Sequence, residues 1–344
     1  MRSGLGEVPE APQVLIVILN WNGRELIKSC LESLEKTSFK SFRVIAVDNG
    51  STDGSQRMVR ALFRKVHMVE NPRNYGYSRG MNEGMLQGCK LYRPDHFVLM
   101  NNDVEVIDPD WLTEMVVLAE SDERIAVVAP KVLRPDGKID FALGTSFPRM
   151  RNIAHGETDR GQYDFRAEAD IVSGACFLVK RSALERVGAY DEAFSPIGYE
   201  DIDLFLRMKR AGFKIVYSGH TKVLHLVSGS RKHFASSQRM YEGLRNYFRC
   251  IRLNFGLAFL ALRVVLTGLH VLRKRKQVSR GQLVKALTAS FEPRRIPGMT
   301  ASSGPGGVES EQMRPRERSI DACGERRRRR GRKHAMTAEL DRDA

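Results

Sequence analysis

Apolar strand-like runs that alternate with amphipathic segments are the feature that most constrains how this chain can fold. The run VLIVIL at 14–19 is apolar throughout, as in a strand that is buried on both faces. The next segment, 25–36, places its apolar residues on one helical face. The alternation continues, with strands expected at 42–48, 66–71 and 96–103 and helices at about 55–65 and 78–90. This order predicts an α/β domain with a mostly parallel central sheet flanked by helices.

Polar loops follow the four apolar runs, at 20–23, 48–54, 71–78 and 101–106, and each of them contains asparagine. Ligands of open parallel sheets bind beyond the carboxyl ends of the strands. Four such loops at one edge therefore predict a pocket for a polar ligand. Loops are commonly built from these residue types, so a purely structural role for any single loop stays open.

The second half of the chain contains a cluster of acids. Residues 170–194 predict a small-residue turn, an apolar strand and a short helix, and 213–230 predicts a strand followed by a loop. Between them, Glu200, Asp201 and Asp203 precede an apolar pattern with helical spacing. Acids are favoured in a first helical turn by capping and by the helix dipole, so a helix start alone would explain all three.

The positive charge is concentrated near the C-terminus. The whole chain has a formal net charge of +15, and residues 273–344 alone contain 19 Lys and Arg against 9 Asp and Glu. The rest of the chain is therefore only weakly basic, and nucleic-acid binding by the folded part is not indicated. From 291 to 344 the composition predicts a disordered basic tail.

The five cysteines are scattered, in mostly apolar contexts and without metal-ligand spacing, which favours buried, reduced thiols in the cytosol. The first residues contain no apolar leader segment, so a flexible N-terminus is expected at 1–12 and the predicted location is cytoplasmic.

The order of the motifs resembles the family-two glycosyltransferases of the GT-A fold, and among them the bacterial rhamnosyltransferase-like branch. Seven segments between 14 and 230 support the resemblance: VILNWNG, VIAVDNGSTDGS, NYGYSRGMNEG, VLMNNDVEV, SGACFLVKRSALERVGAYDEAF, GYEDIDLFLRMKRAGF and VLHLVSGS. It implies a Rossmann-like GT-A domain at 13–235. The apolar pattern that follows predicts a C-terminal helical extension at 236–290. The resemblance also implies transfer of a sugar from a nucleoside diphosphate to a hydroxyl group, with inversion at the anomeric carbon.

The resemblance assigns the nucleotide pocket to the predicted polar edge. Asp48 matches the carboxylate that accepts a hydrogen bond from a pyrimidine N3–H, although a turn-initiating role is the alternative. The other implied nucleotide-binding residues are Leu19, Trp21, Asn22, Asn74, Gly76, Asn82 and Asn102.

A divalent cation, Mn²⁺ or Mg²⁺, is implied by the segment NND at 101–103. Asp103 matches the metal-binding acid, and His225 matches a further ligand of the family, which favours Mn²⁺. The first acid of the motif is replaced by Asn101, which leaves a catalytically inactive relative open. His225 could alternatively be an ordinary core histidine.

The acceptor side is assigned to the acid cluster. Asp201 matches the catalytic base, which must be an ionised carboxylate within reach of the acceptor hydroxyl. Glu200 is expected to contact the acceptor, and Asp203 to be structural, bonding the backbone or Arg207. Gly174 and Ala175 are expected to form a small-residue floor beside the donor sugar.

The apolar segment 255–272 has a narrow polar stripe formed by Arg263, Thr267 and His270, and RKRK follows at 273–276. This pattern favours a helix lying on an anionic membrane surface over one that spans it. Upstream arginines are expected to extend the stripe, namely Arg245, Arg249 and Arg252. Packing of this helix on the catalytic domain is the alternative.

We therefore predict a metal-dependent, inverting glycosyltransferase at the cytoplasmic face of the cell membrane. Its donor would be dTDP-rhamnose or, second, a UDP-hexose or UDP-N-acetylhexosamine, and its acceptor a glycan or a lipid-linked sugar. A nucleotidyltransferase and an inactive nucleotide-sugar-binding relative are the alternatives, and nucleic acid is not expected as a partner.

Overall fold

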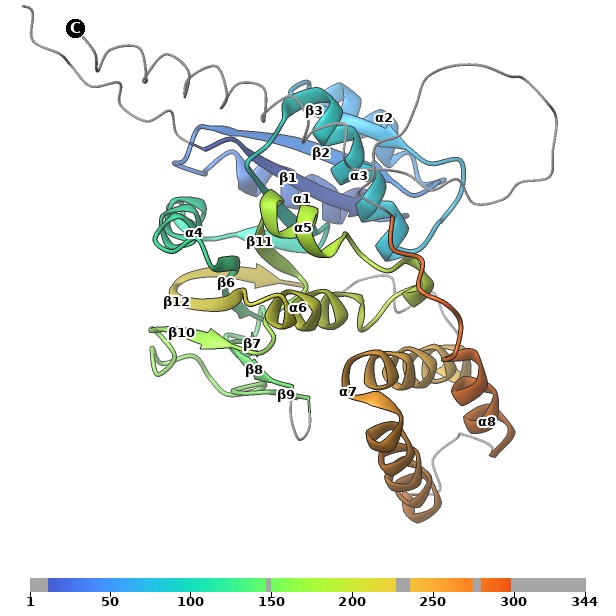
Figure 1. Ribbon diagram of the computed structural model, residues 1–344. Helices are drawn as coiled ribbons and strands as arrows, with labels where there is room; N and C mark the ends of the chain where they lie inside the picture. Colours follow the sequence, from blue (N-terminus) through green and yellow to red (C-terminus); the bar gives the residue numbers. More distant parts are fainter. Residues whose placement is uncertain (1–11, 147–149, 227–235, 275–279, 298–344) are drawn as a thin grey trace, which may run out of the picture.

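The computed structural model describes residues 12–146, 150–226, 236–274 and 280–297 (Figure 1). The predicted flexible N-terminus lies outside the described residues except for Pro12, and so does the predicted basic tail beyond Pro297.

A ten-stranded sheet forms the centre of the molecule. Eight strands follow the order β10-β12-β6-β11-β4-β1-β2-β3, and the other two, β5 (Val104–Val106) and β7 (Ile139–Phe141), pair with β12 and β6. The parallel half contains β1 (Val14–Asn20), β2 (Phe42–Asp48), β3 (Val66–Glu70) and β4 (His96–Asn101). In the other half, β11 (Cys176–Lys180) runs antiparallel between β4 and β6 (Ile125–Leu133), and β12 (Lys214–His225) runs parallel to β6. The predicted mostly parallel sheet is confirmed.

The strand register brings the predicted polar loops to one edge of the sheet. Asn20 pairs with Asp48, and Leu19 pairs with Asn101. Because β11 is antiparallel to β4 and pairs Cys176 with Met100, the small-residue turn before β11 lies at this same edge. Residues that are far apart in sequence therefore meet where the strands end.

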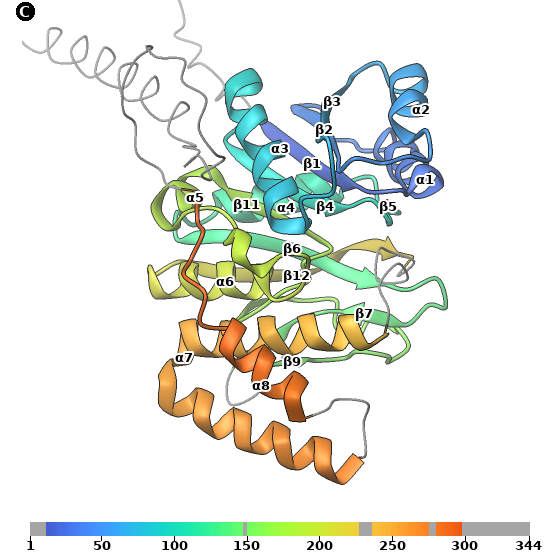
Figure 2. The same cartoon turned by 90° about the vertical axis from the view of Figure 1, so that its right-hand side faces the viewer.

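Helices cover both faces of the sheet (Figures 1 and 2). One face packs against α1 (Arg24–Leu34), α2 (Ser55–Leu62) and α4 (Trp111–Glu120), and the other against α3 (Tyr77–Tyr92), α5 (Arg181–Val187) and α6 (Glu200–Arg210). Strand β1 shows the cause, since Leu15 and Val17 enter one buried cluster while Ile16 and Ile18 enter the other.

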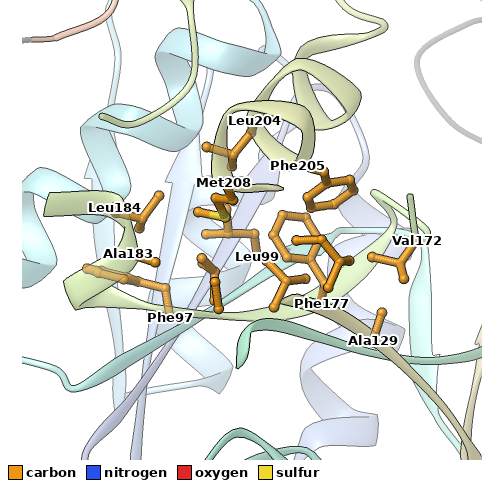
Figure 3. Close-up of a cluster of buried hydrophobic side chains, with 14 of the residues drawn as sticks. Phe97, Leu99, Ala129, Val172, Phe177, Ala183, Leu184, Leu204, Phe205 and Met208 are labelled. Atoms are coloured by element: carbon orange, nitrogen blue, oxygen red, sulfur yellow. The ribbon is translucent and has the colours of Figure 1, made fainter. Parts of the chain in front are cut away.

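The apolar side of α6 determines where its acids lie. Leu204, Phe205 and Met208 pack over the sheet against Phe177 of β11, and the rings of Phe177 and Phe205 are 5.0 Å apart (Figure 3). This packing holds the first turn of α6 at the polar edge of the sheet.

Several short elements were not predicted from the sequence; β5 and η1 lie inside quoted motifs, and the others lie in the intervening segment 139–169. They are β5 (Val104–Val106), β7 (Ile139–Phe141), β8 (Gly144–Thr145), β9 (Arg151–Asn152), β10 (Arg166–Ala169) and the 3₁₀ helix η1 (Glu192–Phe194). With two to four residues each, they are too short for a hydrophobic period to be recognised.

The C-terminal extension consists of α7 (Ser236–Lys274) and α8 (Arg280–Ala289). Helix α7 is broken at Gly256, whose φ of 83° favours glycine. The first arm of α7, 236–255, lies along α6, and the second arm, 257–274, turns away beside α8 (Figure 2). Within the described residues, Met240–Leu269 is the helical segment long and apolar enough to cross a membrane, and the break divides it.

Residues 291–297, which we call the strap, return from α8 to the catalytic domain (Figure 2). The Arg294 guanidinium donates to both carboxylate oxygens of Asp203, at 2.9 and 3.1 Å. The backbone N–H of Arg295 donates to Asp191 Oδ1 at 2.9 Å. The predicted start of the disordered tail at 291 therefore falls within a segment that is held against the domain.

Arg245, Arg249 and Arg252, which were predicted to extend the polar stripe of a membrane-bound helix, bond other parts of the protein instead. Arg245 donates to the carbonyl oxygen of Ser195. Arg249 is buried and Arg252 donates to a carbonyl at the end of α8, Ser290 O, at 3.1 Å. The break at Gly256 is the reason, because it lets the polar side of the first arm face the catalytic domain.

Candidate active site

The loop after β2 is organised around a buried carboxylate. Asp48 is 1% exposed and accepts hydrogen bonds from Ser51 N and Gln56 Nε2, both at 2.8 Å. Asn20 Nδ2 and Ser55 Oγ lie 3.3 and 3.4 Å from its other oxygen. The turn-forming role is therefore present in the structure, and the pyrimidine contact stays a prediction.

The loop after β1 is joined to this turn through Asn22. Its backbone N–H donates to Ser51 Oγ at 2.9 Å, and its side-chain oxygen accepts from Thr52 N at 2.8 Å. Leu19 packs against the core cluster beneath α3. Trp21, two residues later, is half-buried. The structure thus brings the predicted residues of the first two loops together.

Asn49 organises the third loop, and sequence reasoning missed it. It is buried, and its Nδ2 donates to Asn74 Oδ1 at 3.1 Å and to Gly76 O at 3.0 Å. Its Oδ1 accepts from Asn71 Nδ2 at 3.0 Å. Asn49 could have been predicted because it directly follows Asp48 at the end of a strand, where a second polar side chain can reach the neighbouring loop.

Two other predicted nucleotide-binding residues connect elements of the fold. Asn82 bonds the backbone N–H and carbonyl of Tyr190 at 3.1 and 3.0 Å, so its amide links α3 to the segment before η1. Asn102 Nδ2 donates to Asn20 Oδ1 at 2.7 Å, which ties the loop after β4 to the loop after β1.

The two predicted metal ligands are neighbours. Strand β5 pairs with the end of β12, so that His225 lies opposite Val104. His225 Nε2 is 3.2 Å from Asp103 Oδ1, and His225 Nδ1 is 2.9 Å from Asp140 Oδ2. Burial alone would lower the pKa of His225, but the hydrogen bonds and charges of Asp103 and Asp140 raise it to about 9. Asp140 was not predicted as part of the site.

The pair fits a divalent cation, because an oxygen and a nitrogen 3.2 Å apart can both bind one ion at about 2.1 Å. Across the described ranges, no group of three or more His, Cys, Asp and Glu side chains is arranged to hold a metal ion. The protein would therefore supply two ligands, and a diphosphate and water the others, as is usual for Mg²⁺-type sites.

Asp201 and Gly174 are in direct contact. A Cβ atom at Gly174 would lie 2.1 Å from Asp201 Oδ2, so only glycine leaves room for this carboxylate. The carbonyl of the adjacent Ala175 accepts from Asn101 N at 2.9 Å. The predicted base, the predicted sugar floor and the loop with Asp103 are thus parts of one arrangement.

Tyr77 is a further residue of this arrangement that sequence reasoning missed. Its hydroxyl is 3.5 Å from the carbonyl oxygen of Gly174, and its ring packs edge-on against Tyr190. Burial, together with the nearby charges of Glu200 and Asp201, holds the pKa of Tyr77 well above its usual range.

The remaining acids of the cluster have different surroundings. Glu200 is buried and its carboxylate accepts from the N–H of Gly198. Asp203 is fully buried and accepts from Arg207 Nε at 2.8 Å, which confirms the predicted structural pairing. Burial would raise the pKa of Asp203, but Arg207 and Arg294 hold it below the usual range.

The loop before α6 is held by the first arm of α7. Asn246 is fully buried, and its Nδ2 donates to Phe194 O at 2.7 Å and to Gly198 O at 3.0 Å. Tyr199 has a φ of 71°, which is unfavourable for a residue with a side chain, so external contacts are needed to hold it. The C-terminal extension therefore helps to position the first turn of α6.

Comparison with known proteins identifies the family of the chain. Residues 12–246 match the family described as "Glycosyltransferase like family 2". The uncharacterized protein y4gI of Sinorhizobium fredii is 31% identical over 235 residues, which are 64% of this chain but only 25% of that protein's length. The N-acetylglucosaminyl-diphospho-decaprenol L-rhamnosyltransferase of Mycobacterium tuberculosis is 25% identical over 61% of this chain and 75% of its own.

Among solved structures, GalNAc-T7 with UDP, GalNAc and Mn²⁺ superposes with a TM-score of 0.56 at 18% identity, over 71% of this chain and 48% of that one. This likeness supports the predicted GT-A-like fold.

Proposed function

The chain belongs to glycosyltransferase-like family 2, and on this premise we propose that it transfers a sugar from a pyrimidine nucleoside diphosphate to a hydroxyl group with inversion. The observation that carries the proposal is the contact between Asp201 and Gly174 at the sheet edge that also holds Asp103 and His225. A base for the acceptor and ligands for the diphosphate would then lie on either side of the donor sugar.

Rhamnose is the proposed donor sugar, and a glycan or lipid-linked sugar the proposed acceptor. Support comes from the order of the sequence motifs and from the M. tuberculosis relative, whose name describes rhamnosyl transfer to a decaprenol-linked N-acetylglucosamine. A UDP-hexose or UDP-N-acetylhexosamine remains the second choice for the donor.

In this reaction the acceptor oxygen attacks the anomeric carbon, its proton passes to Asp201, and the bond to the nucleoside diphosphate breaks. Asp201 acts as the base because its carboxylate lies against the small-residue floor. Gly174 has no side chain, and this leaves room for the carboxylate. Asp103 and His225 would hold Mn²⁺ or Mg²⁺, which supplies positive charge to the departing diphosphate. Asp48 would receive the pyrimidine.

A panel of nucleotide sugars tests the proposal. With Mn²⁺ present, we expect dTDP-rhamnose to be hydrolysed fastest and to stabilise the protein by about 2.7 kcal/mol at a hundredfold excess over its Kd. Release of nucleoside diphosphate and a rise in thermal unfolding temperature are the measurements. If no nucleotide sugar is hydrolysed or stabilises the protein, the proposal fails. Release of pyrophosphate from a nucleoside triphosphate and a sugar phosphate would instead identify a nucleotidyltransferase.

We further propose that the protein works at the cytoplasmic face of the membrane, docked through the second arm of α7. The exposed side of this arm is apolar, with Leu262, Val265, Leu266 and Leu269 at helical spacing. Its polar side is turned inward, where Arg263 donates to the hydroxyl of Tyr247. A helix on a water-exposed surface would have the opposite orientation.

Charge favours an anionic bilayer as the surface that covers this face. The sequence RKRK follows at 273–276, directly after the apolar residues of the arm. Cations beside an apolar helix face are attracted to anionic headgroups. The first arm is held against the catalytic domain by Cys250, which is buried in one cluster with Phe194 and Leu206, so a membrane-spanning orientation of the whole helix would require their exposure.

Two acids introduced into the apolar face test the docking. The variant Val265→Asp with Leu269→Asp is expected to bind vesicles that contain phosphatidylglycerol at least tenfold more weakly, because two apolar side chains can no longer enter the lipid surface. Co-sedimentation with vesicles measures the effect. Val117→Asp on α4 is the matched control, since Val117 and Val265 are 58% and 59% exposed. Unchanged binding, or a dimer that the double variant dissociates, would contradict the proposal.

A further inference from the structure

Asp140 lies outside the sequence motifs that predicted the site. It lies in β7, which pairs with β6, while β6 pairs with β12 and β12 with β5. Leu133 of β6 is opposite both Ile139 of β7 and Leu224 of β12. Strands β7 and β12 thus pair with the same end of β6, and the side chains of Asp140 and His225 reach each other there.

The two nitrogens of His225 face two different carboxylates. Nδ1 lies 2.9 Å from Asp140 Oδ2, and Nε2 lies 3.2 Å from Asp103 Oδ1. Both Asp140 and His225 are mostly buried, with 18% and 15% of their side chains exposed. An imidazole whose Nδ1 donates to a carboxylate presents Nε2 as the metal-binding atom, and such outer carboxylates fix the ring and its tautomer.

The position of Asp140 is itself fixed by its surroundings. Its carbonyl oxygen accepts from Asn152 Nδ2 at 2.6 Å and is 2.8 Å from His155 Nδ1. His155 Nδ1 is 3.8 Å from the Asp140 carboxylate, too far for a hydrogen bond, and its side chain is exposed. Among the described residues, the Asp140 carboxylate therefore has its hydrogen bond with His225.

We propose that Asp140 is a positioning residue that orients His225, so that Nε2 of His225 and Asp103 together bind the divalent cation of the donor diphosphate. This inference rests on the proposed function. It assigns Asp140 no contact with the cation or with the sugar. A strand outside the sequence motifs, β7, would then influence how tightly the cation is held.

Manganese binding measured without turnover tests the inference. Free Mn²⁺ is titrated by electron paramagnetic resonance in the presence of saturating dTDP, for the wild type, Asp140→Asn and His225→Gln. Asp140→Asn is expected to bind Mn²⁺ about 10–100-fold more weakly, which is the usual effect of removing a carboxylate that orients a metal-binding histidine. Its dTDP affinity in EDTA should match the wild type, because Asp140 does not contact the nucleotide.

Asp136→Asn is the matched control, because Asp136 lies in the turn just before β7, is 42% exposed and pairs with Arg134. It should bind Mn²⁺ like the wild type. If the wild type and His225→Gln bind Mn²⁺ with different affinities while Asp140→Asn equals the wild type, the inference is overturned and the proposed function stands. If the wild type binds no Mn²⁺, both the metal assignment and the inference fall. Weaker nucleotide binding by Asp140→Asn in EDTA would also overturn the inference, since it would indicate a general structural defect.

Discussion

Asp201→Asn is expected to lower the rate of sugar transfer by about 10²–10⁴-fold, the usual contribution of a general base. The amide is isosteric, so it should fit against Gly174 as the carboxylate does, but it cannot take the proton of the acceptor hydroxyl. The rate of transfer with donor and acceptor both saturating is the measurement, because it isolates the chemical step from binding.

Donor binding distinguishes loss of the base from loss of the site. The Kd of the variant for the nucleotide sugar should equal that of the wild type, since Asp48 and the loops around Asn49 are untouched. Glu123→Gln, an exposed position on the loop before β6, is the control for a carboxylate-to-amide change elsewhere. Transfer at the wild-type rate by Asp201→Asn would refute its assignment as the base.

Much of the site could be predicted from the sequence because the order and direction of the strands bring the site residues together. In a parallel sheet, consecutive strands end at one edge, so polar residues after apolar runs must meet there. Asn20, Asp48 and Asn102 are connected for this reason. The acids of α6 were predictable as a helix start, and Asp203 could be paired with Arg207 because residues four apart share a helical face.

The residues that were missed act across long sequence separations without a local pattern. Asp140 lies on a three-residue strand, and its partner His225 is 85 residues away. Asn246 is one of several polar residues in an amphipathic helix, so the spacing of polar and apolar residues does not show that it bonds the loop before α6. The inward direction of Arg245 and Arg249 depends on the break at Gly256, which a hydrophobic pattern does not reveal.

Arg249→Met is expected to lower the free energy of unfolding by about 3–5 kcal/mol, the usual cost of removing one partner of a buried ion pair. Arg249 and Asp191 are 1% and 0% exposed, with Nη2 2.9 Å from Oδ2. Arg249 also donates to Glu292 O and Pro293 O at 2.7 and 2.9 Å, so the variant also removes two of the hydrogen bonds that hold the strap. Methionine fills much of the same volume, which leaves the lost polar contacts as the main change. Urea unfolding measures the effect.

Arg252→Met separates this effect from a general loss of positive charge. Arg252 lies one turn from Arg249, is only partly buried, and donates to Ser290 O and Glu292 O at 3.1 and 3.3 Å. Because Arg252 donates to carbonyl oxygens and not to a buried carboxylate, its loss should cost about 1 kcal/mol. Equal losses for the two variants would contradict the buried ion pair as the cause.

The strap also bears Arg294, which bonds Asp203, and Asp203 is two residues after Asp201. Loosening of the strap should therefore disturb the site before the sheet unfolds. The Arg249→Met variant is expected to lose transfer activity at urea concentrations below those that unfold the sheet.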